Sequence, residues 1–263
     1  MPGLDPVADT ALLTAALRGR ESTRPDRLFD DPLAAVLAGD AGRELIEEFG
    51  DVPAIAVRTR YFDDLLTAVT TAEGGPRQLA LLAAGMDTRA YRLPFPDGST
   101  VFEADRPELL ALKEKRLADA PAPRCRRVAV PVDLAADWPT ALTAAGFRPG
   151  EPTCWLVEGL TQYLHEADVL RLFDRVTALS APGSHLLTDF VSGELLRDPA
   201  SRPMLDAMAE RGAAWHYGTD DPEPLFSARG WRLERDDFAE VGRGLGRWPD
   251  EPVPSGHLVH AFR

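Results

Sequence analysis

A short stretch at residues 79–89, LALLAAGMDTR, decides the fold. Its first part is a continuous apolar run, which ends at Gly85. Apolar runs of this length that end in a glycine are typical of parallel strands buried on both faces. The glycine also lets the backbone approach a ligand closely. The stretch therefore predicts a central strand with a ligand-binding loop at its carboxyl end.

Strands and helices alternate beyond this stretch. An amphipathic helix is expected over 169–179, because its apolar residues recur at the spacing of one helix face. Six further strands are expected at 100–105, 127–132, 153–157, 185–190, 231–234 and 257–262. With the first, they give seven strands. The alternation predicts an α/β fold, with a Rossmann-like, mostly parallel sheet and helices on both faces.

The chain is expected to form a single domain, residues 1–263. Its zones are a helical cap, an α/β core, a lid with the last helix and strand elements, and a final strand, at residues 1–75, 76–190, 191–256 and 257–263. In the cap, Asp31 and Pro32 are expected to open a helix as its N-cap and first residue. Another helix is expected over 57–69, and no strand is expected in this zone.

Composition and charge exclude several function classes. The chain has 42 acidic and 29 basic residues, a net charge of −13 and no basic stripe, which argues against a nucleic-acid partner. The longest apolar runs are too short to cross a bilayer, and the first residues lack a signal-peptide pattern. The two cysteines and five scattered histidines have no metal-site spacing. We therefore expect a cytoplasmic protein without membrane, nucleic-acid or metal partners.

Glycines and carboxylates follow four of the expected strands. Ligands of open parallel sheets bind outside the carboxyl ends of the strands, so these residues are candidates for a site. They are Gly85 with Asp87, Asp105, Asp133 with Leu134, and Glu158 with Gly159. Asp105 lies twenty residues beyond Gly85, which suits a ribose diol, because a carboxylate accepts from two hydroxyls at once.

The glycine pattern distinguishes between two nucleotide-like cofactors. A dinucleotide site needs GxGxxG, but this loop has only Gly85, and Asp87 lies where a pyrophosphate would bind. An acidic residue there favours a positively charged ligand. S-adenosyl-L-methionine carries a sulfonium and an ammonium, so it is the expected cofactor, and an NAD-dependent oxidoreductase ranks lower.

Five stretches, in this order, resemble the leucine carboxyl methyltransferase family. They are RTRYFDD at 58–64, AAGMDTRAYRL at 83–93, FEADRP at 102–107, PVDL at 131–134 and EGLTQYL at 158–164. The resemblance extends from about Arg18 to Phe190 and is closest to an actinomycete-type bacterial branch of S-adenosyl-L-methionine-dependent methyltransferases. It implies a class I methyltransferase fold and a small-molecule or peptide acceptor.

The resemblance also implies roles for single residues. Arg58 is similar to a cap arginine that reaches the cofactor carboxylate and the reaction centre. Tyr163 is similar to a tyrosine that faces the acceptor, so Arg58 and Tyr163 are the expected catalytic residues. Glu158 is similar to an acidic residue near the methionine portion, and Arg18 to a basic residue of the cofactor pocket.

The remaining cofactor-binding residues follow from the same resemblance. Gly85 corresponds to the glycine loop, Asp105 to the residue that holds the ribose, and Asp133 and Leu134 to the pair that flanks the adenine. This chain departs from many relatives at Ala83, where they have a glycine. The added methyl group is expected to shift the loop slightly without removing cofactor binding.

Each of these residues has a structural alternative. Asp105 and Asp133 could cap the helices that follow them. Arg58 could be a solvated partner of nearby acidic residues. Tyr163 and Trp215 could be core aromatics. Together, the strand-end residues are stronger evidence for a binding site than each is alone, because they fall on successive strands of one sheet edge.

The expected reaction is O-methylation of a carboxylate. A carboxylate is ionised at neutral pH and needs no general base, so the protein mainly positions and desolvates it. A hydroxyl or phenol of a secondary metabolite is the alternative acceptor, and it would need a base such as His165 or His216. A non-catalytic S-adenosyl-L-methionine-binding protein is a second alternative. The oligomeric state stays open.

Overall fold

The computed structural model describes residues 6–251 and 253–263, which contain one seven-stranded sheet in the order β3-β2-β1-β4-β5-β7-β6. The strands are β1 (Gln78–Leu82), β2 (Thr100–Asp105), β3 (Arg126–Pro131), β4 (Thr153–Val157), β5 (His185–Val191), β6 (Arg232–Asp237) and β7 (Gly256–Phe262). β1 to β5 are parallel, and β7 pairs antiparallel with β5 and β6. The predicted seven-stranded, mostly parallel sheet is confirmed.

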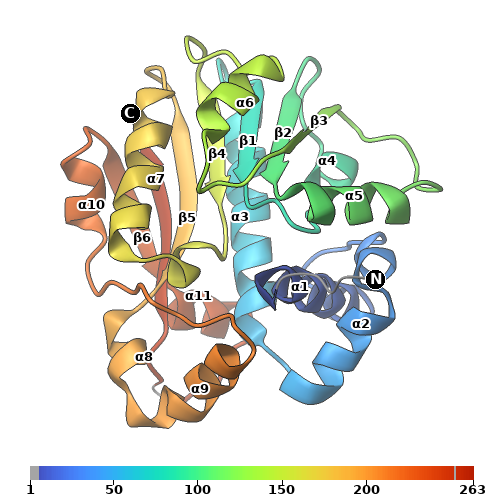
Figure 1. Ribbon diagram of the computed structural model, residues 1–263, viewed down its shortest axis with the longest axis vertical. Helices are drawn as coiled ribbons and strands as arrows, with labels where there is room; N and C mark the ends of the chain where they lie inside the picture. Colours follow the sequence, from blue (N-terminus) through green and yellow to red (C-terminus); the bar gives the residue numbers. More distant parts are fainter. Residues whose placement is uncertain (1–5, 252) are drawn as a thin grey trace.

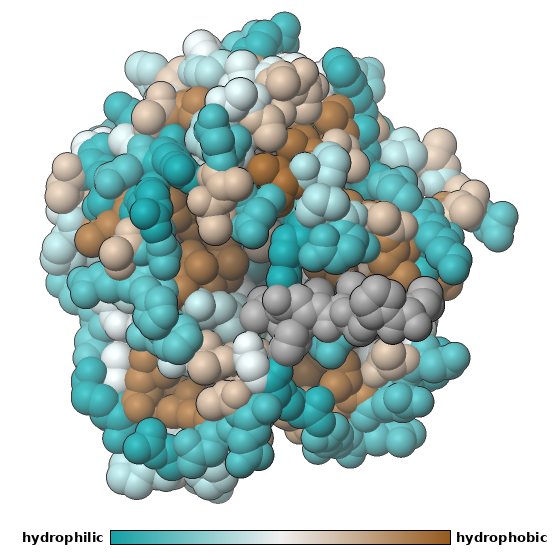
Figure 2. Space-filling view, viewed as in Figure 1, coloured by the Kyte–Doolittle hydropathy of each residue, from teal (hydrophilic) through white to brown (hydrophobic). Residues whose placement is uncertain are grey.

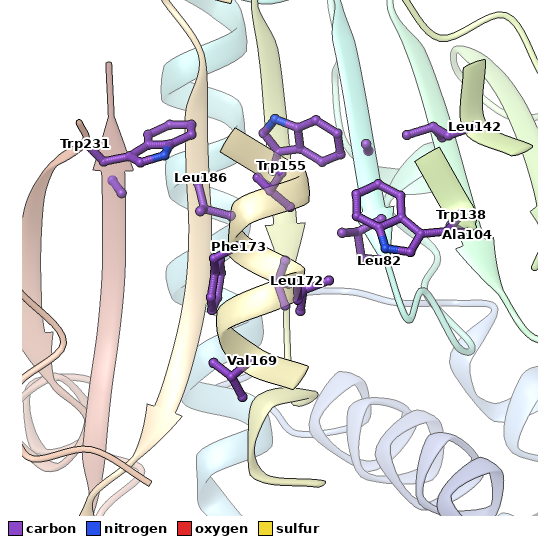
Figure 3. Close-up of a cluster of buried hydrophobic side chains, with 14 of the residues drawn as sticks. Leu82, Ala104, Trp138, Leu142, Trp155, Val169, Leu172, Phe173, Leu186 and Trp231 are labelled. Carbon is purple, nitrogen blue, oxygen red and sulfur yellow. The ribbon is translucent and has the colours of Figure 1, made fainter. Parts of the chain in front are cut away.

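Helices cover both faces of the sheet (Figure 1). One face carries α6 (Trp138–Ala144), α7 (Glu166–Ala178) and α10 (Glu223–Ser227). At this layer Trp138 and Trp155 meet edge to face, with ring centroids 6.2 Å apart (Figure 3). The other face carries α3 (Pro53–Thr71), α4 (Arg89–Arg92) and α11 (Phe238–Gly244). The sheet is therefore the middle layer of a Rossmann-like α/β fold.

The three N-terminal helices do not all lie beyond the sheet. Val57, Phe62 and Leu66 of α3 are buried against the sheet face that holds Leu79 and Leu156. The other two, α1 (Pro6–Ser22) and α2 (Ala34–Phe49), pack on each other and on α5 (Pro107–Arg116). Figure 1 shows α1 below the carboxyl ends of β1 and β2. Only α1 and α2 therefore lie where a cap over the strand ends is expected.

The predicted helix cap at Asp31 is wrong. The N-cap of α2 is Leu33, and Asp31 lies outside the helix. The Asp31 carboxylate instead accepts hydrogen bonds from Arg18 Nε (2.9 Å) and from the Thr88 hydroxyl (2.7 Å). A buried carboxylate needs partners of this kind, and here two distant segments supply them.

A helical segment separates β5 from β6. It contains α8 (Gly193–Arg197), the 3₁₀ turn η2 (Pro199–Ser201) and α9 (Arg202–Glu210). The loop that follows returns to the sheet edge, where the His216 N–H donates to the carbonyl of Gln162 (2.6 Å) in the 3₁₀ turn η1 (Thr161–Tyr163). Polar side chains cover most of the face in Figure 2. Within the described residues, every helix is too short or too polar to span a bilayer.

Candidate functional site

A cavity of about 390 Å³ lies at the carboxyl edge of β1, β2 and β4, next to α1. It is lined by every residue that the sequence assigned to the site, namely Arg18, Arg58, Gly85, Asp105, Asp133, Leu134, Glu158 and Tyr163. Thr10, Ala11 and Thr14 of α1 close one side. The structure thus brings the predicted residues together from four strand ends and several helices.

The loop after β1 comes close to α1 at Gly85. Gly85 has φ +48°, and a Cβ atom there would lie 3.2 Å from the Cβ of Ala11. Ala83 has φ +57° and is the only non-glycine residue with a positive φ in the described part of the chain. Ala83 therefore adopts the left-handed backbone that suits a glycine, at a cost of about 1–2 kcal/mol.

Asp105 holds this loop from the end of β2. Its Oδ2 accepts from the Gly85 N–H (2.6 Å) and its Oδ1 from the Arg106 N–H (2.7 Å). Burial raises the pKa of the Asp105 carboxyl. The N-cap of α5 is Arg106, so the alternative role of Asp105 as a helix cap is wrong. Each oxygen of Asp105 keeps a lone pair for a further donor.

Asp133 and Leu134 lie in the loop after β3. Asp133 is exposed, and its Oδ1 accepts from the Ala135 N–H (2.8 Å). The next helix, α6, is capped by Asp137, whose carboxylate accepts from the Thr140 N–H. The helix-cap alternative for Asp133 is therefore wrong too. Leu134 is half-buried against the core on the α6 side of the sheet.

Glu158 joins two arginines at the end of β4. Its Oε1 accepts from Arg58 Nε (2.9 Å) and its Oε2 from Arg89 Nη1 (2.7 Å). Burial alone would raise the pKa of Glu158, but Arg89 and Arg58 outweigh it and lower the pKa. Burial of the Glu158 carboxylate after an apolar strand would be unfavourable without partners, and the two arginines provide them within the protein. Arg58 is no solvated partner of its neighbours on α3, so that alternative is wrong.

The sequence reasoning missed Asp189. This β5 residue is 4% exposed, and its Oδ2 accepts from Arg58 Nη1 (3.2 Å) while its Oδ1 accepts from the Gly159 N–H (2.7 Å). A signal existed, because Asp189 is a carboxylate inside the buried strand HLLTDFV. Its partner Arg58 lies 131 residues earlier in the chain, so no local pattern could identify it.

Asp87 does not act as the free counter-charge that the sequence suggested. Its Oδ1 accepts from the Arg89 N–H (2.7 Å) and its Oδ2 from Arg89 Nη1 (2.5 Å). Burial would raise the pKa of Asp87, but the nearby cations, Arg89 first, lower it to about 2. Asp87 lines the cavity as the partner of Arg89.

Four arginines and five carboxylates form one continuous ionic network beside the cavity. In order along the contacts, they are Arg18, Asp31, Arg92, Asp63, Arg89, Glu158, Arg58 and Asp189, and Asp87 also pairs with Arg89. With all groups ionised, the network carries one net negative charge. It connects α1 and α3 to the ends of β1, β4 and β5.

Comparison with known proteins identifies the family of this chain. Residues 11–177 match the leucine carboxyl methyltransferase family. A provisionally named S-adenosyl-L-methionine-dependent methyltransferase from Parafrankia is 43% identical over 98% of this chain and 87% of its own length. One from Mycobacterium avium is 39% identical over 97% of this chain and 86% of its own length. The chain belongs to the leucine carboxyl methyltransferase family.

Solved structures show the same fold. A provisionally named methyltransferase from Thermobifida fusca has a TM-score of 0.62 at 18% identity, and the match covers 96% of this chain and 94% of that one. A DUF574-family protein from Streptomyces avermitilis has a TM-score of 0.62 at 19% identity, over 95% and 97% of the two chains. This member of the family is an S-adenosyl-L-methionine-dependent methyltransferase.

The residues at the cavity fit this cofactor. A glycine loop gives close backbone approach, and Asp105 keeps acceptor capacity for hydroxyls. The ionic network has one surplus negative charge, which complements a cofactor that carries a sulfonium and an ammonium against one carboxylate. The donor set is therefore of the kind that such a cofactor needs.

Tyr163 also lines the cavity. It lies in η1 and is half-buried, and its ring meets Trp215 edge to face at 6.5 Å. The rings of His165 and His216 lie against each other, tilted by 32°, with ring centroids 4.2 Å apart. Neither histidine is among the described residues that line the cavity.

Proposed function

We propose that this methyltransferase transfers the methyl group to a carboxylate oxygen of a small molecule or peptide. The observation that carries the proposal is the free edge of Arg58. Its Nε and Nη1 are bonded to carboxylates, whereas Nη2 has no hydrogen-bond partner among the described residues and is not buried. Arg58 lines the cavity together with Tyr163. An arginine with one open edge at a cavity suits carboxylate recognition.

In this proposal the chain binds, orients and excludes water. Asp105 and Gly85 hold the ribose side of the cofactor, Asp133 and Leu134 its adenine side, and Glu158 and Arg58 its methionine side. S-adenosyl-L-methionine supplies a methyl group already activated by the sulfonium. Arg58 and Tyr163 orient the acceptor carboxylate, which needs no base because it is ionised. The helical segment with α8 and α9 is the proposed lid on the acceptor side, whereas α10, β6 and α11 belong to the sheet and its covering layers.

A carboxylate is favoured over a hydroxyl by what lines the cavity. A hydroxyl or phenol acceptor would need a positioned base with a pKa near neutrality, which is usually a histidine. The described lining includes no histidine. It does include Arg58, which stabilises an anion rather than removing a proton.

The acceptor class is tested by the chemistry of the product. The protein is incubated with S-adenosyl-L-methionine that carries a tritiated methyl group, and with matched pairs of carboxylic acids and their alcohol or phenol counterparts. Carboxyl methyl esters release volatile tritiated methanol in mild base, whereas methyl ethers do not. We expect base-labile label with acids only. Base-stable label with the alcohols or phenols would contradict the proposal.

A further inference from the structure

The second carboxylate at Arg58 belongs to β5 and lies outside the expected site. We infer that Asp189 is a positioning residue, which holds Arg58 so that Nη2 faces the cofactor and acceptor carboxylates. The inference rests on the proposed role of Arg58. Asp189 is not among the described residues that line the cavity, so it acts through Arg58 and not on a ligand directly.

Asp189 fixes two groups at once. One oxygen accepts from Arg58 Nη1 (3.2 Å) and the other from the Gly159 N–H (2.7 Å). A Cβ atom on Gly159 would lie 2.7 Å from both Nη1 and Nη2 of Arg58, so the guanidinium rests on this glycine. Asp189 therefore fixes the positions of both the Arg58 guanidinium and the Gly159 backbone on which it rests.

Glu158 alone cannot supply this constraint. It is shared, because Oε1 faces Arg58 Nε (2.9 Å) while Oε2 faces Arg89 Nη1 (2.7 Å). A single hydrogen bond at Nε leaves the guanidinium free to swing about that contact. The second bond, from Nη1 to Asp189, fixes the plane of the group and leaves the Nη2 edge for a ligand. Two bonds along a planar fork give this orientation.

Asp189 is a buried acceptor whose bond to Arg58 can be removed with little change in side-chain shape. Its carboxylate is 4% exposed, and the pKa of the carboxyl is raised mainly by burial and lowered in part by Arg58. An isosteric Asp189→Asn variant keeps an acceptor for the Gly159 N–H. Its NH2 group then faces Arg58 Nη1, donor against donor, so the charge-assisted bond to Arg58 is lost. The variant therefore loosens Arg58 with little change in shape.

The test is a double-mutant cycle on S-adenosylhomocysteine affinity, measured by calorimetry. The variants are Arg58→Ala, Asp189→Asn and the double variant. Glu103→Gln is the matched control, because Glu103 is a fully buried carboxylate with an ion pair to Lys113 (2.6 Å) and does not line the cavity. Unfolding temperatures are measured for all four variants without ligand.

We expect Arg58→Ala to weaken binding about 100-fold and Asp189→Asn about 10-fold, as for lost charged hydrogen bonds. The double variant should bind within about threefold of Arg58→Ala, because Asp189 acts only through Arg58. Glu103→Gln should bind like the wild type, even where its unfolding temperature falls.

The outcomes separate the two claims. If the effects of Arg58→Ala and Asp189→Asn multiply in the double variant, or if Asp189→Asn binds like the wild type, Asp189 does not position Arg58, and the proposed role of Arg58 stands. If Arg58→Ala binds like the wild type, the role of Arg58 toward the cofactor and the inference on Asp189 are both overturned.

Discussion

The β3-β2-β1-β4 half of the sheet and the β5-β7-β6 half meet at Arg58, but they are built differently. In the first half, Asp105 ends β2, Glu158 directly follows β4 and Gly85 lies in the loop after β1, and all three line the cavity. In the second half, Asp189 lies inside its strand, and its partner comes from α3. The comparison shows that strand-end residues can be identified from local sequence. The partner of the proposed positioning residue Asp189, by contrast, lies far away in the chain.

Gly159, where the two halves touch, should give the largest effect. Gly159→Ala places a Cβ atom 2.7 Å from the Arg58 guanidinium in a backbone with φ +64°. We expect turnover to fall about 100-fold, as for a displacement of about 1 Å at a reaction centre, and stability to fall by about 1–2 kcal/mol. Steady-state kinetics and urea unfolding measure the two effects.

Gly230→Ala is the matched control for Gly159→Ala. Gly230 has a similar φ of +74° but nothing within 4 Å of an added Cβ atom. The Gly230→Ala variant should lose a similar amount of unfolding free energy and keep the turnover of the wild type. Equal losses of turnover in both variants would show that backbone strain, and not displacement of Arg58, matters at Gly159.

Asp105→Asn tests the cofactor half alone. Asn has one acceptor oxygen, so it cannot accept from Gly85, Arg106 and ribose hydroxyls as the carboxylate can. We expect affinity for S-adenosylhomocysteine to fall about 10- to 100-fold, as for lost charged hydrogen bonds. Asp137→Asn, at the exposed cap of α6, should bind like the wild type. Equal calorimetric affinities for Asp105→Asn and the wild type would remove Asp105 from the site.

Asp87→Asn concerns stability in the same half. The pKa of Asp87 falls from 3.8 to about 2 in the fold. A lowered pKa stabilises the fold fully above the unfolded value, and this contribution is lost as the pH falls from about 4 to 2. We expect the variant to lose about 2 kcal/mol at pH 7, and the difference to narrow toward pH 2. Urea unfolding at pH 7 and pH 3 measures the difference in unfolding free energy between the variant and the wild type. An equal difference at the two pH values would contradict this expectation.

Ala83→Gly should give the smallest effect. The substitution relieves a left-handed backbone at φ +57°, which stabilises the fold by about 1–2 kcal/mol. Glycine also gives the unfolded chain more conformational freedom, which offsets about 0.4–1 kcal/mol of this stabilisation. We expect a gain below about 1 kcal/mol in urea unfolding and affinity for S-adenosylhomocysteine within about threefold. A tenfold change in affinity would show that the Ala83 methyl group helps to shape the loop.

The sequence predicted most of the sheet because its signals are local. The bounds of β2 and β4 agree with the structure, and the other strands differ by one to three residues at an end. Every predicted site residue lines the cavity, because parallel strands place their carboxyl ends at one edge.

What the sequence could not predict depends on distant partners. Asp31 resembles a helix cap locally, but Arg18 and Thr88 bind its carboxylate. Asp87 is neutralised by Arg89, two residues away, through a loop geometry that spacing does not reveal. Asp189 finds Arg58 across 131 residues. Buried charges are satisfied by whatever the fold brings near, so their partners become known only with the fold.

The most direct test of the account is a crystal structure of the protein with S-adenosylhomocysteine. The account predicts that the ribose hydroxyls lie within hydrogen-bond distance of Asp105, that the adenine lies beside Asp133 and Leu134, and that the ligand carboxylate contacts Arg58 Nη2. A ligand bound outside this cavity, or inside it with Asp105 and Arg58 both without contact, would contradict the account.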